Sequence, residues 1–300
     1  MNFKEELTQK TEQMEEVLKQ YLPKEEGYAG TVIEAMNYSV LAGGKRLRPM
    51  LMWETTVLFG SAGESIKPFM AALEMIHNYS LVHDDLPAMD NDECRRGRKT
   101  THVVYGEGMA VLAGDGLLNY AFETAATAFD LAENMEDYRK IGKAMQILAG
   151  KAGIYGMIGG QCADLNAEEP ETQVSEEMLL YIHEHKTAAL IQSAMMIGAV
   201  LAGASGEEIA AIEKCAYNIG IAFQIQDDIL DVTGSQEVLG KPIGSDEKNH
   251  KLTYVSMHGL KESKEQVEEL SKEAISILTS FAQRNLFLEQ LVEQLIYREK

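Results

Sequence analysis

The spacing of proline is the feature that most narrows what this chain can fold into. Six prolines occur in 300 residues, and none lies between positions 88 and 169 or between 171 and 241. Both proline-free spans are rich in Ala, Leu, Met and Glu, which favour helices. Alternating apolar and polar residues bounded by hairpin turns are scarce. The sequence therefore predicts an all-α protein.

Apolar residues recur at helical spacing along most of the chain. The predicted helices cover residues 5–21, 30–43, 47–60, 65–86, 107–132, 136–161, 175–203, 206–232, 261–282 and 286–298. The sequence has neither a repeat of solenoid period nor a low-complexity tail, and no break reads as a linker between two cores. We therefore expect a single domain over residues 1–300, long enough to bury a large core.

Composition excludes several classes of function. The chain has 47 Asp and Glu against 27 Lys and Arg, a formal net charge of −20. Nucleic-acid binding needs a basic face, so we expect no nucleic-acid partner. The three cysteines form no CxxC pair, which argues against a disulfide framework and a thiolate zinc site.

The sequence gives no sign of a targeting or membrane segment. The first ten residues contain Glu5 and Glu6 and lack the apolar centre of a signal peptide. The most apolar stretch, residues 188–204, contains Gln192 and Ser193 and is better interpreted as a buried helix. We expect a cytoplasmic protein that does not associate with membranes.

An aspartate-rich segment ends the apolar helical run from Phe69 to Val82. From His83 it reads His-Asp-Asp-Leu-Pro-Ala-Met-Asp-Asn-Asp. A straight helix would place Asp84 and Asp90 about 120° apart around its axis. Pro87 disfavours helical geometry at the residue before it, so a turn is expected there. Such a turn would let both carboxylates reach one hard cation.

A second aspartate cluster lies within another apolar helical run. Asp227 and Asp231 are four residues apart and share one helix face, with Asp228 beside them. Oxygen ligands of this kind select Mg²⁺ or a similar hard ion, which also accepts substrate phosphates. A solvated acidic helix end explains either cluster alone equally well. The presence of two such clusters favours a metal site.

Two dense basic runs stand out in so acidic a chain. One is Gly43–Pro49, which contains three cations, and the other is Arg95–Lys99, which follows the first aspartate cluster. Arg offers paired donors to phosphate oxygens and Lys a point charge. A surface patch of ion pairs is the alternative for each run. The chain contains neither a Walker A nor a GxGxxG motif, so nucleotide binding is not indicated. The two basic runs together with the aspartate clusters therefore favour two diphosphate substrates.

These segments resemble the motifs of the trans-isoprenyl diphosphate synthases, with bacterial farnesyl diphosphate synthases as the most similar members. The first aspartate cluster with Arg95-Arg96-Gly97 resembles the family's first aspartate-rich motif. Four further segments resemble the family's other motifs and occur in the family's order: Gly44–Pro49, Lys186-Thr187, Phe223–Asp231 and Gly240-Lys241. The resemblance runs from Lys45 to Lys300.

The resemblance implies an all-α helical bundle around a central cavity, with the two aspartate motifs facing each other, and a homodimer. It also implies three Mg²⁺ ions per active site, with Mn²⁺ as the alternative ion. The implied metal ligands are Asp84, Asp90, Asp227 and Asp231. The resemblance also implies that Asp85 and Asp228 are catalytic members of the same motifs, outside the set of implied metal ligands.

The resemblance further implies how the two substrates are held. The allylic diphosphate would be held by Arg95, Lys186, Thr187, Gln224, Lys241 and Lys251, of which Arg95, Lys186 and Lys241 also count as catalytic. Isopentenyl diphosphate would be held without metal by Lys45, Arg48, His77 and Arg96. On the residues alone, His77 would be an ordinary hydrogen-bonded core histidine.

The implied activity is the condensation of isopentenyl diphosphate with dimethylallyl or geranyl diphosphate, by magnesium-assisted ionisation, to (2E,6E)-farnesyl diphosphate. The resemblance also implies that Tyr79 and Ser80 are the chain-length residues. Tyr79 lies about 7.5 Å before Asp84 along the helix, and Ser80 lies one turn before it. An ordinary core aromatic is the alternative for Tyr79. The segment Gly159–Asp164 also resembles part of the family, and we assign it no role.

Other activities remain open at the sequence level. The nearest alternative is a geranylgeranyl or geranyl diphosphate synthase, which stops the same chemistry at another length. A class I terpene cyclase would need no second diphosphate site, so the cluster Lys45–Arg48 argues against it. A non-catalytic partner subunit would be expected to have lost ligands, and this chain keeps both aspartate sets.

Overall fold

The structure is a computed structural model that describes residues 2–61, 63–169, 171–233 and 252–296. Contacts within the chain divide it into two compact units. Unit 1 comprises Met1–Trp53 and Ser61–Met145, and unit 2 comprises Glu54–Gly60 and Gln146–Lys300. The expectation of one domain over residues 1–300 stays a prediction.

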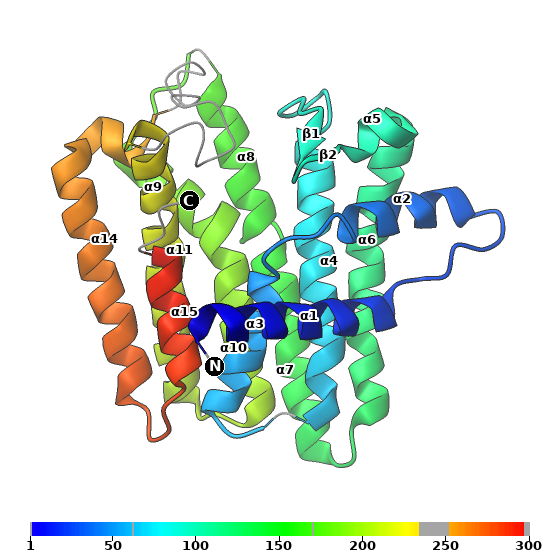
Figure 1. The fold of residues 1–300 in the computed structure, drawn as a ribbon, viewed down its shortest axis with the longest axis horizontal. Coiled ribbons are helices and arrows are strands. Elements are labelled where there is room, and N and C mark those ends of the chain that lie inside the picture. The colour runs from blue at the N-terminus through cyan, green and yellow to red at the C-terminus, as the bar shows by residue number, and fades with distance from the viewer. Residues whose placement is uncertain (1, 62, 170, 234–251, 297–300) are drawn as a thin grey trace. The chain divides into compact units, whose positions relative to one another are not determined.

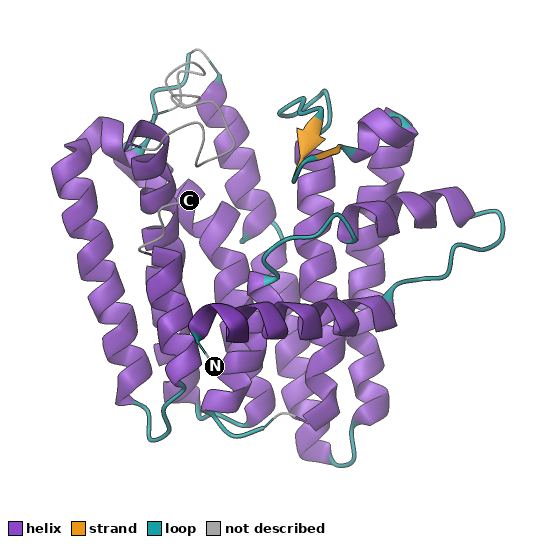
Figure 2. Ribbon diagram, viewed as in Figure 1, coloured by secondary structure: helices purple, strands orange, loops and turns teal. Residues whose placement is uncertain are grey.

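Most of the described residues are helical and very few of them form strands (Figure 2), which confirms the all-α class. In chain order up to the end of α7, the elements are α1 (Phe3–Tyr21), α2 (Gly30–Val40), α3 (Leu47–Leu58), η1 (Gly63–Ser65), α4 (Ile66–Asp84), β1 (Cys94–Arg95), β2 (Arg98–Lys99), α5 (Thr101–Tyr105), α6 (Glu107–Ala126), η2 (Thr127–Leu131) and α7 (Met135–Ala152). They continue with α8 (Met157–Glu168), α9 (Glu176–Ile182), η3 (His183–Ala188), α10 (Ala189–Ala202), α11 (Gly206–Thr233), α14 (Tyr254–Ser280) and α15 (Leu286–Ile296).

Helix α4 is the central element of unit 1. It packs against α6, which runs beside it in Figure 1, and also contacts α1 and α2. Phe69, Leu73 and Ile76 recur at helical spacing and are fully buried. At Gly114 of α6, an added Cβ would lie only 2.0 Å from Nε2 of His83. This close approach fixes the end of α4, where the first aspartate cluster begins.

Helix α11 is the central element of unit 2. It packs against α14, which runs beside it in Figure 1, and against α10 and η3. Ile212, Cys215 and Ile219 form its fully buried face. At Gly220, an added Cβ would lie 2.2 Å from the Cβ of Ala188, so only glycine admits η3 this closely. The second aspartate cluster occupies the last turns of this anchored helix.

For two of the predicted helices, the structure shows a glycine at the point of difference. The helix predicted over 136–161 is interrupted, because the chain turns between Ala152 and Met157. An added Cβ at Gly156 would lie 2.1 Å from the carbonyl oxygen of Lys151, so this turn depends on glycine. The helix predicted over 261–282 begins earlier, at Tyr254, and is kinked at Gly259, where φ is 81°.

Within the residues that the structure describes, no helix combines the length and apolar character needed to cross a membrane.

Candidate active site

The first aspartate cluster forms a tight turn at the end of α4. The helix ends at Asp84, and the backbone N–H of Asp90 donates to the carbonyl of Asp84 at 2.9 Å. The N–H of Asn91 donates to the carbonyl of Leu86 at 3.1 Å, and Asn91 adopts a φ of 54°. The predicted break near Pro87 is therefore confirmed, and it returns the backbone of Asp90 to that of Asp84.

Asp85 is directed into unit 1 and is buried. Its Oδ1 accepts a hydrogen bond from Nε of Arg95 at 2.6 Å, and a second guanidinium nitrogen of Arg95 lies 3.5 Å from Asp92. Burial raises the pKa of the Asp85 carboxyl, and the charge of Arg95 opposes that rise. The pair therefore ties the second basic run to the aspartate turn.

Arg95 reaches Asp85 from a two-stranded hairpin. Strands β1 and β2 pair antiparallel, with Arg95 opposite Arg98. The turn residues Arg96 and Gly97 have φ values of 52° and 73°, as a two-residue hairpin turn of this twist requires. The sequence did not indicate this hairpin, because Arg-Gly is not one of the strong turn pairs and the strands are only two residues long.

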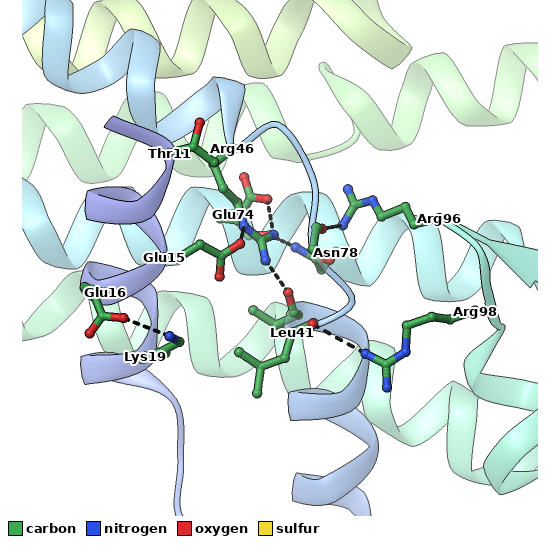
Figure 3. A network of polar contacts seen from close by, with 12 residues as sticks. Thr11, Glu15, Glu16, Lys19, Leu41, Arg46, Glu74, Asn78, Arg96 and Arg98 are labelled. Carbon is green, nitrogen blue, oxygen red and sulfur yellow. Dashed lines mark hydrogen bonds and ion pairs between the residues drawn. The ribbon is translucent and has the colours of Figure 1, made fainter. Parts of the chain in front are cut away.

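The two basic runs meet within unit 1. Arg96 donates to the carbonyl of Gly43, and its guanidinium carbon would lie 3.0 Å from a Cβ added at Gly44. Arg98 donates to the carbonyl of Leu41 at 3.4 Å, as Figure 3 shows. The glycine pair that precedes Lys45 is therefore in contact with the hairpin.

Arg46 is the buried cation of the first basic run (Figure 3). It donates to Glu15 at 2.6 Å, to Glu74 at 2.8 Å and to the carbonyl of Val40 at 2.6 Å. Burial lowers the pKa of Arg46, but the two carboxylates outweigh that effect and leave the pKa above its ordinary value. Arg46 thus links the start of α3 to α1, α4 and α2.

The sequence alone did not indicate a separate role for Arg46. A signal was available in α4, because Glu74 is the one carboxylate in the apolar run from Phe69 to Val82. A carboxylate at a buried position needs a charged or hydrogen-bonding partner. Arg46 supplies that partner.

We expect Arg46→Met to lower the free energy of unfolding by about 3 kcal/mol or more, because it leaves the buried carboxylate of Glu74 without its cation. Urea denaturation followed by circular dichroism measures the effect. Lys19→Met is the matched control, since it removes an ion pair with Glu16 that is exposed at the surface of α1. Equal stability of the two variants would contradict the assignment of Arg46.

Arg48 and His77 lie within the same basic region of unit 1. Burial lowers the pKa of His77 well below its ordinary value, and the charges of Arg48 and Arg96 lower it further, so the ring is neutral at pH 7. Burial also lowers the pKa of Arg48 to about 10. Among the described residues, Nε of Arg48 is buried without a hydrogen-bond partner. A buried donor of this kind is suited to an anionic ligand.

Tyr79 and Ser80 lie on the last turns of α4. The Tyr79 side chain is buried, and its ring meets the His83 ring edge-on, with centroids 5.9 Å apart. Burial raises the pKa of Tyr79 to about 12, and the charge of Asp84 adds to this rise. The hydroxyl of Ser80 donates to the carbonyl of His77 at 2.9 Å.

The second aspartate cluster lies on one continuous helix, as predicted. Asp227 and Asp231 are one turn apart near the end of α11. Nε2 of Gln224 donates to Asp227 at 3.4 Å. Asp228 accepts the backbone N–H of Tyr254 at 2.8 Å, so it anchors the start of α14.

Lys186 and Thr187 lie in η3, a single stretch of π-helix between α9 and α10. Nζ of Lys186 lies 2.6 Å from Oδ2 of Asp164 on α8. A π-helical stretch inside an α-helix frequently marks a functional site. The sequence predicted one regular helix over 175–203, because nothing in its periodicity distinguishes a π turn.

Not every predicted residue can be placed. Lys241 and Lys251 lie outside the described residues. In the part of the chain that is described, no group of three or more His, Cys, Asp or Glu side chains forms a metal-binding cluster. Each motif therefore has one pair of carboxylates as candidate metal ligands: Asp84 with Asp90 in the first motif, and Asp227 with Asp231 in the second.

Comparison with known proteins decides the family. Residues 30–293 match the family model described as polyprenyl synthetase. The chain belongs to the polyprenyl synthetase family. Among curated members, a farnesyl diphosphate synthase of Geobacillus stearothermophilus is 43% identical over 261 residues, which cover 87% of this chain and 86% of the relative. A geranylgeranyl diphosphate synthase of Cyanophora paradoxa is 41% identical over 292 residues, which cover 97% and 95%.

A solved structure agrees with this family. The crystal structure of an FPP/GFPP synthase from Zymomonas mobilis superposes with a TM-score of 0.86 at 32% identity, covering 98% of this chain and 99% of that one. The all-α isoprenoid synthase fold and the trans-prenyl synthase family are thereby confirmed. This polyprenyl synthetase is a prenyltransferase whose relatives carry the names of different products.

Proposed function

We propose that this chain condenses isopentenyl diphosphate with dimethylallyl or geranyl diphosphate to give (2E,6E)-farnesyl diphosphate. The product length rests on Tyr79, whose buried ring lies five residues before Asp84 on α4. A ring at that position would block a growing chain that extends from the aspartate cluster along the helix. Geranylgeranyl diphosphate is the main alternative product.

We propose that isopentenyl diphosphate binds to Lys45, Arg48, His77 and Arg96. The buried and unpartnered Nε of Arg48 is the observation that supports this site. A neutral His77 donates or accepts a hydrogen bond without adding charge. Arg96, held at the carbonyl of Gly43, adds a second guanidinium.

We propose that the allylic diphosphate is held by Arg95, Lys186, Thr187, Gln224, Lys241 and Lys251, together with Mg²⁺. The donors fit this ion, because they are carboxylate oxygens and Mg²⁺ is usually bound by one or two carboxylates plus substrate phosphates. The ligands would be Asp84, Asp90, Asp227 and Asp231, and three ions are expected, with Mn²⁺ as the alternative. Bound Mg²⁺ would stabilise negative charge on the departing diphosphate.

In the proposed reaction, the bond between C1 of the allylic substrate and its diphosphate oxygen breaks, and both electrons leave with the diphosphate. The double bond of isopentenyl diphosphate attacks C1 and forms the new carbon–carbon bond. A proton then leaves the isopentenyl unit and is taken up by the released diphosphate. The cations Arg95 and Lys186 stabilise the leaving group, and buried rings such as that of Tyr79 exclude water from the carbocation.

We also propose that the chain is a homodimer. Val103 and Val104 of α5 and Val111 and Leu112 of α6 are exposed apolar side chains on two helices in contact with each other. A second copy would cover them. Light scattering on the 33.2 kDa chain is expected to give twice that mass, and the monomer mass would contradict the proposal.

The test of the proposed function is product analysis with the purified chain alone. Incubation with Mg²⁺, dimethylallyl diphosphate and radiolabelled isopentenyl diphosphate should give a labelled fifteen-carbon diphosphate. A twenty-carbon or ten-carbon product would assign one of the alternative synthases. Diphosphate release from the allylic substrate alone would indicate a cyclase, and absence of any product would indicate a non-catalytic subunit.

A further inference from the structure

We infer that Asp164 is a positioning residue, which holds the ammonium group of Lys186 in place for the allylic diphosphate. This inference rests on the proposed function and gives a role to the segment Gly159–Asp164. It depends on how α8 meets η3 within unit 2.

The contact itself is short and partly shielded. Nζ of Lys186 lies 2.6 Å from Oδ2 of Asp164, and the two side chains are 25% and 14% exposed. An ion pair shielded in this way is screened less by solvent and salt than a pair on the open surface. The long, flexible stem of lysine otherwise gives its ammonium group many positions. Asp164 therefore restricts the ammonium before substrate arrives.

The backbone of Lys186 is held by the same face of α8. A Cβ added at Gly160 would lie 2.1 Å from the backbone nitrogen of Lys186, so only glycine admits this approach. Gly160 and Asp164 are four residues apart and therefore share a helix face. Gly160 thus receives the backbone of Lys186, and Asp164 holds the end of its side chain. The two positions on this face of α8 therefore fix both the backbone and the ammonium group of Lys186.

The other side of η3 is fixed against α11, which carries the second aspartate cluster. Ala188 of η3 packs directly against Gly220 of α11, where a Cβ would lie 2.2 Å from the Cβ of Ala188. Nε2 of His183 lies 4.0 Å from Oδ2 of Asp228. The π-helical stretch therefore connects the Asp164–Lys186 pair with the neighbourhood of Asp227 inside one unit.

His183 does not take the place of Lys186 as the cation beside Asp164. Burial lowers the pKa of His183 to about 4, although the charge of Asp164 opposes that shift. The imidazole is therefore neutral at pH 7. The side chain that Asp164 contacts at ion-pair distance is therefore Lys186.

The test is a double-mutant cycle on the full chain, with Asp164→Asn, Lys186→Met and the double variant. We expect each single variant to lower kcat about tenfold or more, because Lys186→Met removes the cation that contacts the reacting diphosphate and Asp164→Asn removes the charge that positions this cation. The KM for isopentenyl diphosphate should stay unchanged. Because Asp164 acts through Lys186, the double variant should be no slower than Lys186→Met. Independent, additive losses would overturn the inference.

Two further variants separate positioning from general stability. Glu213→Gln breaks an ion pair with Lys151 that has a similar length, 2.7 Å, and lies in the same unit. It should keep wild-type kcat, and a loss equal to that of Asp164→Asn would overturn the inference. If Asp164→Asn does not unfold cooperatively, Asp164→Glu takes its place in the cycle. That variant keeps the charge but displaces it, so a wild-type kcat would count against positioning.

The outcome for the wild-type chain separates this inference from the proposed function. A wild-type chain that makes no prenyl diphosphate contradicts the proposed function and this inference with it. An active wild type with an additive cycle contradicts this inference alone.

Discussion

Asp84→Ala and Asp227→Ala are each expected to lower kcat about a hundredfold to a thousandfold, since each removes a carboxylate that would hold the Mg²⁺ needed to stabilise the departing diphosphate. Both variants should fold, because Asp227 is exposed on α11 and Asp84 lies half-exposed at the end of α4. Steady-state kinetics at several Mg²⁺ concentrations measure the loss. The Mg²⁺ concentration needed for half-maximal rate should rise in both.

The control for these variants is Asp130→Ala, which removes an exposed aspartate of η2 that belongs to neither cluster. It should keep the wild-type rate and Mg²⁺ dependence. Circular dichroism and thermal unfolding check that all variants fold. Near-normal kinetics in both Asp84→Ala and Asp227→Ala would defeat the metal assignment.

Tyr79→Ala is expected to shift the main product from fifteen carbons to twenty or more. The buried ring lies about 7.5 Å before Asp84 along α4, and its removal would open space in the direction of the growing chain. Chromatography of the radiolabelled products measures the change. The length should increase by whole five-carbon units, since each step adds one isopentenyl group.

Tyr79→Phe is the matched variant for this experiment, because it keeps the ring and removes only the hydroxyl. It should still give the fifteen-carbon product. If Tyr79→Ala and the wild type had the same product distribution, the ring would be an ordinary core aromatic and the length would be set elsewhere.

The parts of the site that depend on local chemistry could be predicted from the sequence. Pro87 is sufficient to predict the turn after Asp84, and the hydrogen bond from Asp90 to Asp84 confirms it. Spacing alone places Asp227 and Asp231 on one helix face, and α11 confirms that they share a helix. In both cases the determining interactions lie within a few residues.

The parts that depend on distant contacts could not be predicted in the same way. The pair of Arg95 with Asp85 needs a hairpin that no strong turn signal announces. The burial of Arg46 depends on Glu15 and Glu74, from two other helices. The turn at Gly156 needs a residue without a Cβ, because a Cβ there would lie 2.1 Å from the carbonyl oxygen of Lys151, and this contact becomes visible only in three dimensions.

In the proposed mechanism, both aspartate clusters bind one diphosphate through shared Mg²⁺ ions. The most direct test of this arrangement is a crystal structure of the chain with Mg²⁺ and an unreactive analogue of the allylic diphosphate. We predict carboxylate oxygens of Asp84 and Asp227 at about 2.1 Å from ions that contact the same diphosphate. A diphosphate and its ions bound at one cluster, with the other cluster's carboxylates out of reach, would contradict this arrangement.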